Sequence, residues 1–310
     1  MHQKRWIGFV LVITGAVLWG IGGSISQWLF QNAHIPVGWF VSIRLLVSGI
    51  LLIGISAITK GRRVFYIWGD RRSAFQIIIY GVLGMLAVQY TFMSSIHYGN
   101  AAVATLLQYL GPVIIIAYLV LAKVAAFRMK EGLAVILALL GSYLLLTNGK
   151  PSGLSVPLPA IVWGLLSAFA LAFYTVYPTK LLARWGSLGV VGWAMFIGGL
   201  ALAVVHPPWS IDTSQWDGTV VLMLFLAVIF GTMFAFWFYI DSLNYLFPQE
   251  TSLLGTVEPL TALLVSIIWL HVSFGIWQFV GVICIIAMVF VLSINGKRKQ
   301  RRQSPASHEI

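Results

Sequence analysis

Long apolar stretches alternate with short polar segments along almost the whole chain. A helix that crosses the hydrocarbon core of a bilayer needs about 20 predominantly apolar residues. Ten stretches meet this requirement, and several of the short segments between them contain Gly, Pro or Asn, which favour turns. The predicted spans are 6–29, 37–59, 73–97, 100–122, 130–148, 158–179, 188–206, 217–244, 250–271 and 275–295. The pattern therefore predicts an all-α polytopic membrane protein.

The composition supports this reading. Of the 310 residues, 60% are hydrophobic and 9% are charged, whereas soluble proteins have about 45–50% apolar and about 25% charged residues. The single cysteine, Cys284, excludes an intrachain disulfide. The first apolar stretch is too long for the core of a cleaved signal peptide, so we expect it to be the first span.

The basic residues predict the orientation of the chain. Seventeen of the 19 lysines and arginines precede the first span, follow the last one, or lie in the segments after the second, fourth and sixth spans. By the positive-inside rule both termini are cytoplasmic. The net charge of +11 then reflects topology and contact with anionic lipids at the cytoplasmic face, and it does not indicate nucleic-acid binding.

Two parts of the chain resemble each other. Residues 94–116 align with 241–263 without a gap, at a shift of 147 residues. The matched residues are Ser95 with Ser242, Tyr98 with Tyr245, the Leu-Leu pairs 106–107 and 253–254, and Pro112 with Pro259. The shared order of these matches indicates an internal repeat.

The repeat predicts the domain organisation. We expect a first five-helix repeat at 1–148, a linker at 149–157, a second five-helix repeat at 158–295 and a basic, disordered cytoplasmic tail at 296–310. Because five is odd, the second repeat must enter the membrane from the opposite side. Inverted repeats of this kind are typical of secondary transporters.

These features resemble the paired EamA domains of the drug/metabolite transporter superfamily. The resemblance rests on Trp-Gly at 19–20 and 163–164, on Arg44-Leu45, and on the two matched passages that end at prolines. The resemblance implies a ten-helix carrier. Members of the superfamily export amino acids, other metabolites or toxic compounds, and relatives carry sugar phosphates or nucleotide sugars. A Gly-Glu-Arg cluster that is common after the fourth and ninth spans is absent here, which leaves the subfamily open.

Glu258 is the most informative polar residue. At 1.5 Å per residue it falls near the middle of its span, where an ionised carboxylate is costly unless it is paired, hydrated or protonated. Pro259 removes a helical hydrogen bond and can kink the helix, and Pro112 is its repeat mate. Glu258 could bind a substrate amine or couple transport to protons. It could equally be a permanent partner of Arg44 or of the carbonyl freed by the proline.

Three other polar residues are weaker candidates for coupling or gating. Arg44 could bind a substrate carboxylate, but snorkelling or pairing with Glu258 explains it equally well, and we favour a structural role. Asp241 lies near the cytoplasmic end of the eighth span. His97 closes the third span at the outer face, where an interfacial cap is a simpler role than a titrating gate.

Aromatic and amide side chains deep in the spans could line a cavity for an apolar or aromatic amine. The candidates are Trp19, Gln89, Tyr90, Gln108, Tyr109, Trp163, Tyr174 and Trp237. Helix packing is the alternative role for each of them. Trp19 and Trp163 stand out because the repeat places them at equivalent depths.

The sequence contains no H-E-x-x-H, P-loop or G-x-S-x-G motif and no Cys/His cluster, so we expect no catalytic residue, metal or cofactor. A phosphate-bearing substrate would need several embedded cations, and only Arg44 is available. We expect a carrier in the bacterial cell membrane that exports small amino-acid-like or amphipathic solutes by alternating access. Protons are the candidate coupling ion. A monomer would suffice, because both repeats are on one chain.

Three alternatives remain. The first is a carrier for drugs or toxic compounds. The second is an intramembrane enzyme acting on lipid or peptide, with Glu258 and Asp241 as acids, but it lacks a catalytic signature. The third is an assembly or signalling subunit, for which the short loops leave little docking surface.

Overall fold

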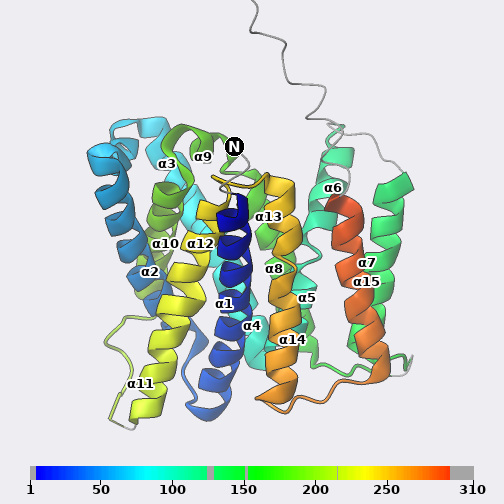
Figure 1. Ribbon diagram of the computed structural model, residues 1–310. Coiled ribbons are helices and arrows are strands. Elements are labelled where there is room, and N and C mark those ends of the chain that lie inside the picture. The colour runs from blue at the N-terminus through cyan, green and yellow to red at the C-terminus, as the bar shows by residue number, and fades with distance from the viewer. Residues whose placement is uncertain (1–4, 124–128, 151–152, 215, 294–310) are drawn as a thin grey trace, which may run out of the picture.

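The computed structural model describes residues 5–123, 129–150, 153–214 and 216–293. All regular elements of this part of the chain are helices, which stand side by side in one bundle with the N-terminal segment at its upper end (Figure 1). The predicted basic tail, 296–310, lies outside the described residues. The expected all-α fold is confirmed.

The helices of the first half are interrupted at several points. Their bounds are α1 Arg5–Asn32, α2 Val37–Lys60, the 3₁₀ helix η2 Gly61–Gly69, α3 Arg71–Ile79, the π-helix η3 Tyr80–Leu86, α4 Ala87–Tyr98, α5 Ala101–Gln108, α6 Gly111–Leu121 and α7 Met129–Thr147. The third span is thus continuous from α3 to α4, and the fourth is formed by α5 and α6.

The second half has a similar series. Its elements are α8 Leu158–Val176, α9 Thr179–Trp185, α10 Ser187–Ala203, α11 Gly218–Phe225, the π-helix η4 Leu226–Phe234, α12 Ala235–Ser242, α13 Pro248–Leu254, α14 Val257–Ile268 and α15 Ile276–Ser293. The eighth span is continuous from α11 to α12. The ninth runs from Glu250 in α13 to the end of α14.

Within the described ranges, nine segments are long and apolar enough to cross a membrane. A tenth is reached when α9 and α10, which are bent by 119° against each other, count as one span. The sixth span ends at Val176 instead of the predicted residue 179. Pro178 explains the earlier end, because proline has no N–H to continue the helical hydrogen bonds.

The third and eighth spans contain π-helical segments at equivalent positions. Under the shift of 147 residues, Tyr80 and Leu86 at the ends of η3 correspond to Ala227 and Met233 within η4. In η4 the hydroxyl of Thr232 donates to the carbonyl of Ala227, 2.9 Å away. Such segments are rare and occur frequently at functional sites. No local sequence pattern predicted them.

The fourth and ninth spans are broken just before their prolines. The fourth is interrupted at 109–110, before α6, and the ninth at 255–256, before α14. Pro112 and Pro259 therefore lie in the first turns of α6 and α14. The N–H groups of a first turn have no intrahelical partner, so proline is tolerated there.

Helix packing follows the repeat. The first span, α1, packs on the eighth through η4 and α12 and on the ninth through α14, while the sixth span, α8, packs on the third through α4 and on the fourth through α5 and α6. α2 packs on α10, and α7 packs on α15. Exchanging the two halves thus maps this set of contacts onto itself.

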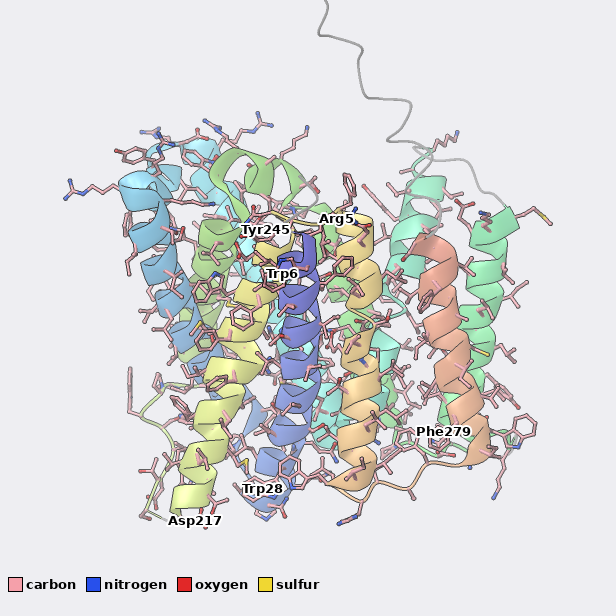
Figure 2. All side chains as sticks on the ribbon, viewed as in Figure 1. Arg5, Trp6, Trp28, Asp217, Tyr245 and Phe279 are labelled. Atoms are coloured by element: carbon pink, nitrogen blue, oxygen red, sulfur yellow. The ribbon has the colours of Figure 1, made fainter. Side chains whose placement is uncertain are left out.

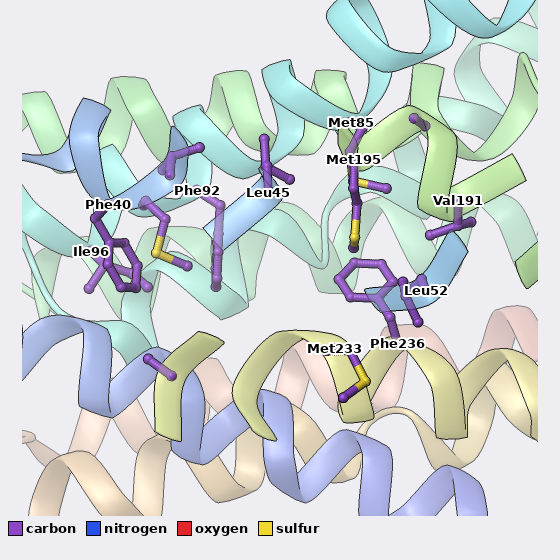
Figure 3. Close-up of a cluster of buried hydrophobic side chains, with 14 of the residues drawn as sticks. Phe40, Leu45, Leu52, Met85, Phe92, Ile96, Val191, Met195, Met233 and Phe236 are labelled. Carbon is purple, nitrogen blue, oxygen red and sulfur yellow. The ribbon is translucent and has the colours of Figure 1, made fainter. Parts of the chain in front are cut away.

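The larger core lies among α1, α2, η3, α4, α10, η4 and α12. Figure 3 shows Met85 and Met195 next to Phe236 and Leu52, and all four side chains are buried. Small residues allow the closest helix contacts elsewhere. A Cβ added at Gly22 of α1 would lie 2.6 Å from the Cα of Gly231 in η4, so these backbones touch without side chains between them.

Candidate functional site

The two helix breaks meet each other. The hydroxyl of Tyr109, at the break of the fourth span, donates a 2.7 Å hydrogen bond to the carbonyl of Gly255, at the break of the ninth. In an uninterrupted helix this carbonyl would accept from the N–H of residue 259, which is a proline. The backbone N–H of Glu258 also donates to it, at 2.9 Å. A polar contact between the two halves thus satisfies the carbonyl that the proline frees.

Glu258 lies beside this contact. It occupies the first turn of α14, where the helix dipole favours a negative charge. Its side chain is partly buried, and its Oε2 lies 3.4 Å from the Tyr109 hydroxyl. Among the described residues, no lysine, arginine or histidine nitrogen lies within 4.0 Å of its carboxylate.

Aromatic side chains surround the segment from Gly255 to Glu258. Trp19 of α1 packs on Tyr239 of α12, with ring centroids 4.9 Å apart. Trp19 also meets the edge of Phe236 at 4.8 Å. The next residue, Gly20, touches the ninth span, because a Cβ added there would lie 2.7 Å from the carbonyl oxygen of Glu258.

Tyr239 belongs to this site, although the sequence analysis did not select it. An atom of its ring lies 3.4 Å from the position of a Cβ built at Gly255. Nothing in the local pattern separates Tyr239 from the other aromatic residues of 234–239. Tyr239 is distinguished only by its packing on Trp19 and against Gly255 at the break of the ninth span.

The side chain of Arg44 binds other groups of the bundle instead of Glu258. Its side chain is 4% exposed, its Nη1 donates to the sulfur of Met93 at 3.2 Å, and its Nη2 donates to the carbonyl of Gly231 at 3.4 Å. One turn further along α2, the Ser48 hydroxyl donates to the carbonyl of Val228 at 3.2 Å. Arg44 and Ser48 therefore hold η4 against α2. The Nε of Arg44 is buried without a partner.

A second aromatic group lies between the third and sixth spans. Tyr90 meets Trp163 edge to face at 5.8 Å, and Tyr174 stacks on Tyr80 at 5.3 Å. Trp163 precedes Gly164, which lies against Leu107 and Ser95.

In the described part of the chain, none of the remaining predicted residues forms a hydrogen bond or an ion pair with Glu258. Trp237 stacks on Phe234, and Gln89 is buried in α4. Gln108 is partly buried at the end of α5. Asp241 accepts a hydrogen bond from Asn244 at 2.8 Å. His97 is exposed at the end of α4 and lies edge-on to Phe30.

Two ion pairs connect the halves near the N-terminal end of the bundle. Arg5 of α1 pairs with Glu250 of α13 at 2.7 Å, and Figure 2 shows Arg5 at the same end as Tyr245. Arg184 of α9 pairs with Asp70, which precedes α3, also at 2.7 Å.

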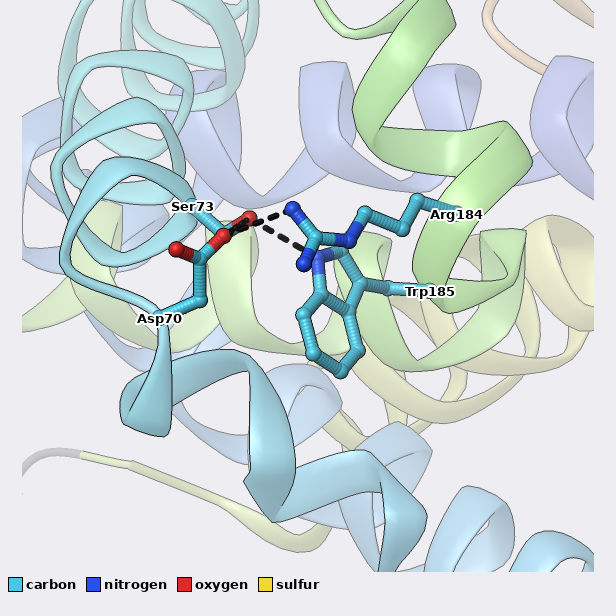
Figure 4. A network of polar contacts seen from close by, with 4 residues as sticks. All are labelled: Asp70, Ser73, Arg184 and Trp185. Atoms are coloured by element: carbon cyan, nitrogen blue, oxygen red, sulfur yellow. Dashed lines mark hydrogen bonds and ion pairs between the residues drawn. The ribbon is translucent and has the colours of Figure 1, made fainter.

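A hydrogen-bonded network surrounds Asp70 (Figure 4). The Ser73 hydroxyl donates to its carboxylate at 2.6 Å, and the indole N–H of Trp185 donates to Ser73 at 2.9 Å. The Ser73 hydrogen bond, assisted by the charge of Arg184, lowers the pKa of Asp70 below its ordinary value.

The opposite end of the bundle contains a pocket of about 500 Å³. Its lining residues are Asn100, Asn148, Ser155, Val156, Val272, Ser273, Phe274, Gly275 and Gln278. An apolar hollow of about 360 Å³ lies between α6 and α8. Glu258 lines neither of them. Ion pairs therefore link the two halves at one end of the bundle, and polar groups line a pocket at the other.

Comparisons with known proteins agree with this architecture. The model of the EamA-like transporter family matches residues 6–147 and 158–294. The chain is 35% identical over 298 residues to the uncharacterized inner membrane transporter YicL of Salmonella typhimurium, covering 95% of this chain and 97% of that protein. It is 24% identical over 240 residues to an uncharacterized transporter of Archaeoglobus fulgidus, covering 76% of this chain and 80% of that protein.

A solved structure has the same fold. The crystal structure of another protein superposes with a TM-score of 0.63 at 16% sequence identity, covering 94% of this chain and 98% of that chain. The two family matches together span nearly the whole bundle. The chain therefore belongs to the EamA-like transporter family and is a membrane transporter rather than an enzyme.

Proposed function

We propose that this transporter is an alternating-access exporter of small amino-acid-like or amphipathic metabolites. It consists of two inverted five-helix repeats, with both termini in the cytoplasm. The observation that carries this proposal is the contact of the two helix breaks, where Tyr109 binds the carbonyl of Gly255 beside Glu258. Broken helices that meet at the interface of two repeats form the substrate sites of many secondary transporters.

The packing supports the inverted repeats. The partners of the first span, the eighth and ninth, correspond under the repeat to the partners of the sixth span, which are the third and fourth. The π-helices η3 and η4 also occupy corresponding positions. Two halves of this kind can exchange their conformations, and the exchange would open one end of the bundle while closing the other.

The charge distribution supports the orientation and the location. Arg5, Arg71 and Arg184, at the end that carries the ion pairs, belong to the basic set that the positive-inside rule assigns to the cytoplasm. The Salmonella relative is named as an inner membrane transporter, and we propose the same location here. The proposed direction of transport, which is export, rests on the resemblance to members of the superfamily that export their solutes.

A solute-release assay tests the function. Cells that overproduce the wild type are compared with cells producing Glu258→Gln, across a panel of amino acids and amines and at two external pH values. We expect release of a defined solute by the wild type and its loss in Glu258→Gln at equal abundance in the membrane. Glu131→Gln, a carboxylate change in α7, is the matched control and should release the solute normally. Equal release by the wild type, by Glu258→Gln and by cells without the protein would refute the proposal.

A labelling assay tests the orientation. In a Cys284→Ser background, Ser273→Cys places a thiol in the wall of the 500 Å³ pocket, and Thr179→Cys places one at the start of α9. A membrane-impermeant maleimide should label the first in intact cells and the second only after permeabilisation. The reverse pattern would invert the proposed topology.

A further inference from the structure

We infer that the solute group bound beside Glu258 is an ammonium, so that the cargo is a small amine with a net positive charge and an apolar or aromatic body. This inference rests on the proposed function and narrows its substrate class. It excludes zwitterionic amino acids and anions as preferred solutes.

The carboxylate of Glu258 retains free acceptor capacity. An ionised carboxylate has about four lone-pair sites for hydrogen bonds. The only protein donor to this side chain in the described part of the chain is the Tyr109 hydroxyl at 3.4 Å, and that hydroxyl makes its shorter bond to Gly255. An ammonium supplies a compensating charge and up to three N–H donors, which is what a carboxylate at this depth lacks.

The side chains next to Glu258 suit the same ligand. Tyr109 contacts the carboxylate, Tyr239 lies against Gly255, and Trp19 packs on Tyr239. A cation within about 6 Å of an aromatic ring centre is attracted to the face of the ring, most strongly where water is excluded. A carboxylate flanked by such rings binds the ammonium group, while the rings accept the apolar body of the same molecule.

Near Glu258, the described part of the chain offers no available cation for a carboxylate on the solute. Apart from Lys130 at the first position of its span, Arg44 is the one lysine or arginine within the predicted spans, and it is 4% exposed. Both of its terminal nitrogens are used, one by the sulfur of Met93 and the other by the carbonyl of Gly231. A bidentate bond to a solute carboxylate would have to break these contacts and release η4. Its unpartnered Nε is also buried, so it offers no surface to a solute.

A matched series of four ligands tests the inference. Phenethylamine, phenylalanine, 3-phenylpropionate and 2-phenylethanol share one aromatic ring and differ in charge. Their binding to the purified full-length protein in nanodiscs is measured by calorimetry at pH 7.5. We expect phenethylamine to bind at least ten-fold more tightly than 2-phenylethanol. Phenylalanine and 3-phenylpropionate should bind more weakly than phenethylamine.

Variants assign the effect to Glu258. In Glu258→Gln the preference for the amine over the alcohol should fall to less than two-fold, while Glu258→Asp should keep part of it and Glu131→Gln all of it. If Glu258→Gln fails to fold, the order of the four binding affinities of the wild type still tests the preference for an ammonium group.

Three results would overturn the inference. They are tightest binding of phenylalanine, tightest binding of 3-phenylpropionate, and an amine preference that survives in folded Glu258→Gln. The proposed carrier function would stand in each case if the release assay succeeds. Release of another solute without binding of any of the four ligands would also overturn only the ammonium inference. The proposed function itself fails only if the wild type releases no more of any solute than cells without the protein.

Discussion

The hydroxyl of Tyr109 donates to the carbonyl of Gly255, the group that Pro259 leaves without its helical donor. The two residues are 146 positions apart and belong to different halves of the chain. The proline of one half is therefore accommodated by a tyrosine of the other. The same contact holds the Tyr109 ring beside Glu258, so the helix break and the candidate site share one structural origin.

Removing this hydroxyl should destabilise the fold modestly. Tyr109→Phe deletes one hydrogen bond, but the N–H of Glu258 still donates to Gly255. We expect a loss of about 0.5–1.5 kcal/mol in the free energy of unfolding, measured by reversible denaturation in mixed micelles. Tyr118→Phe, on the exposed face of α6, is the matched control and should change little. Equal losses in both variants would show that the contact with Gly255 contributes nothing.

The glycine contact of α1 with η4 should not tolerate a methyl group. A Cβ at Gly22 would lie 2.6 Å from the Cα of Gly231, and both partners are backbone. Gly22→Ala should therefore push the helices apart, at a cost of about 1–3 kcal/mol of unfolding free energy. In Gly54→Ala the new Cβ meets nothing within 4 Å, so this control should be neutral or slightly stabilising. Thermal unfolding of both variants in the same detergent measures the difference.

The cluster at Asp70 predicts an acid-sensitive contact. The pKa of Asp70 is lowered in the folded protein, so its stabilising effect is present above the ordinary aspartate pKa of about 3.9 and is lost as the pH falls through the folded value. Because the Ser73 hydrogen bond is the larger cause, Ser73→Ala should raise this pKa more than Arg184→Gln. Carbon NMR of protein with labelled aspartate carboxyls measures both shifts. A larger shift in Arg184→Gln would reverse this order of causes.

The ion pair of Arg5 with Glu250 should contribute little to global stability. Its side chains are 35% and 22% exposed, and pairs with such access to water typically contribute about 0.2–1 kcal/mol. A double-mutant cycle with Arg5→Ala and Glu250→Ala should give a coupling energy in this range, and high salt should reduce it. The exchanged pair, Arg5→Glu with Glu250→Arg, should recover most of the coupling. A coupling above about 2 kcal/mol would mean that the pair is effectively shielded from water.

The sequence analysis singled out the central residue of the candidate site but not its contacts. The depth of Glu258 and its adjacent proline follow from counting residues along an apolar stretch. The position of the break follows from the missing N–H of proline. Neither property identifies the donor to the freed carbonyl, because that donor comes from a different span. The sequence therefore left Arg44 and a substrate amine open as partners of Glu258.

The two halves also differ where the repeat alone suggests symmetry. Arg44 of α2 binds the carbonyl of Gly231 in η4. On the other side of the molecule, Gly198 of α10 lies against the carbonyl of Gly81 in η3. Towards the second span, η4 is thus held by a charged side chain, whereas η3 packs on the seventh span by close backbone contact.

The sequence by itself determined the class of protein, the repeat and the approximate positions of the spans. These properties depend on sums over neighbouring residues, because the cost of placing a segment in lipid is set by its own side chains and by its own satisfied backbone. Only the tertiary structure decided the π-helices, the place of Tyr239, the partners of Arg44 and the bond between Tyr109 and Gly255. Each of these depends on which polar group of one helix meets which carbonyl or ring of another, and that is fixed by the packing of segments far apart along the chain.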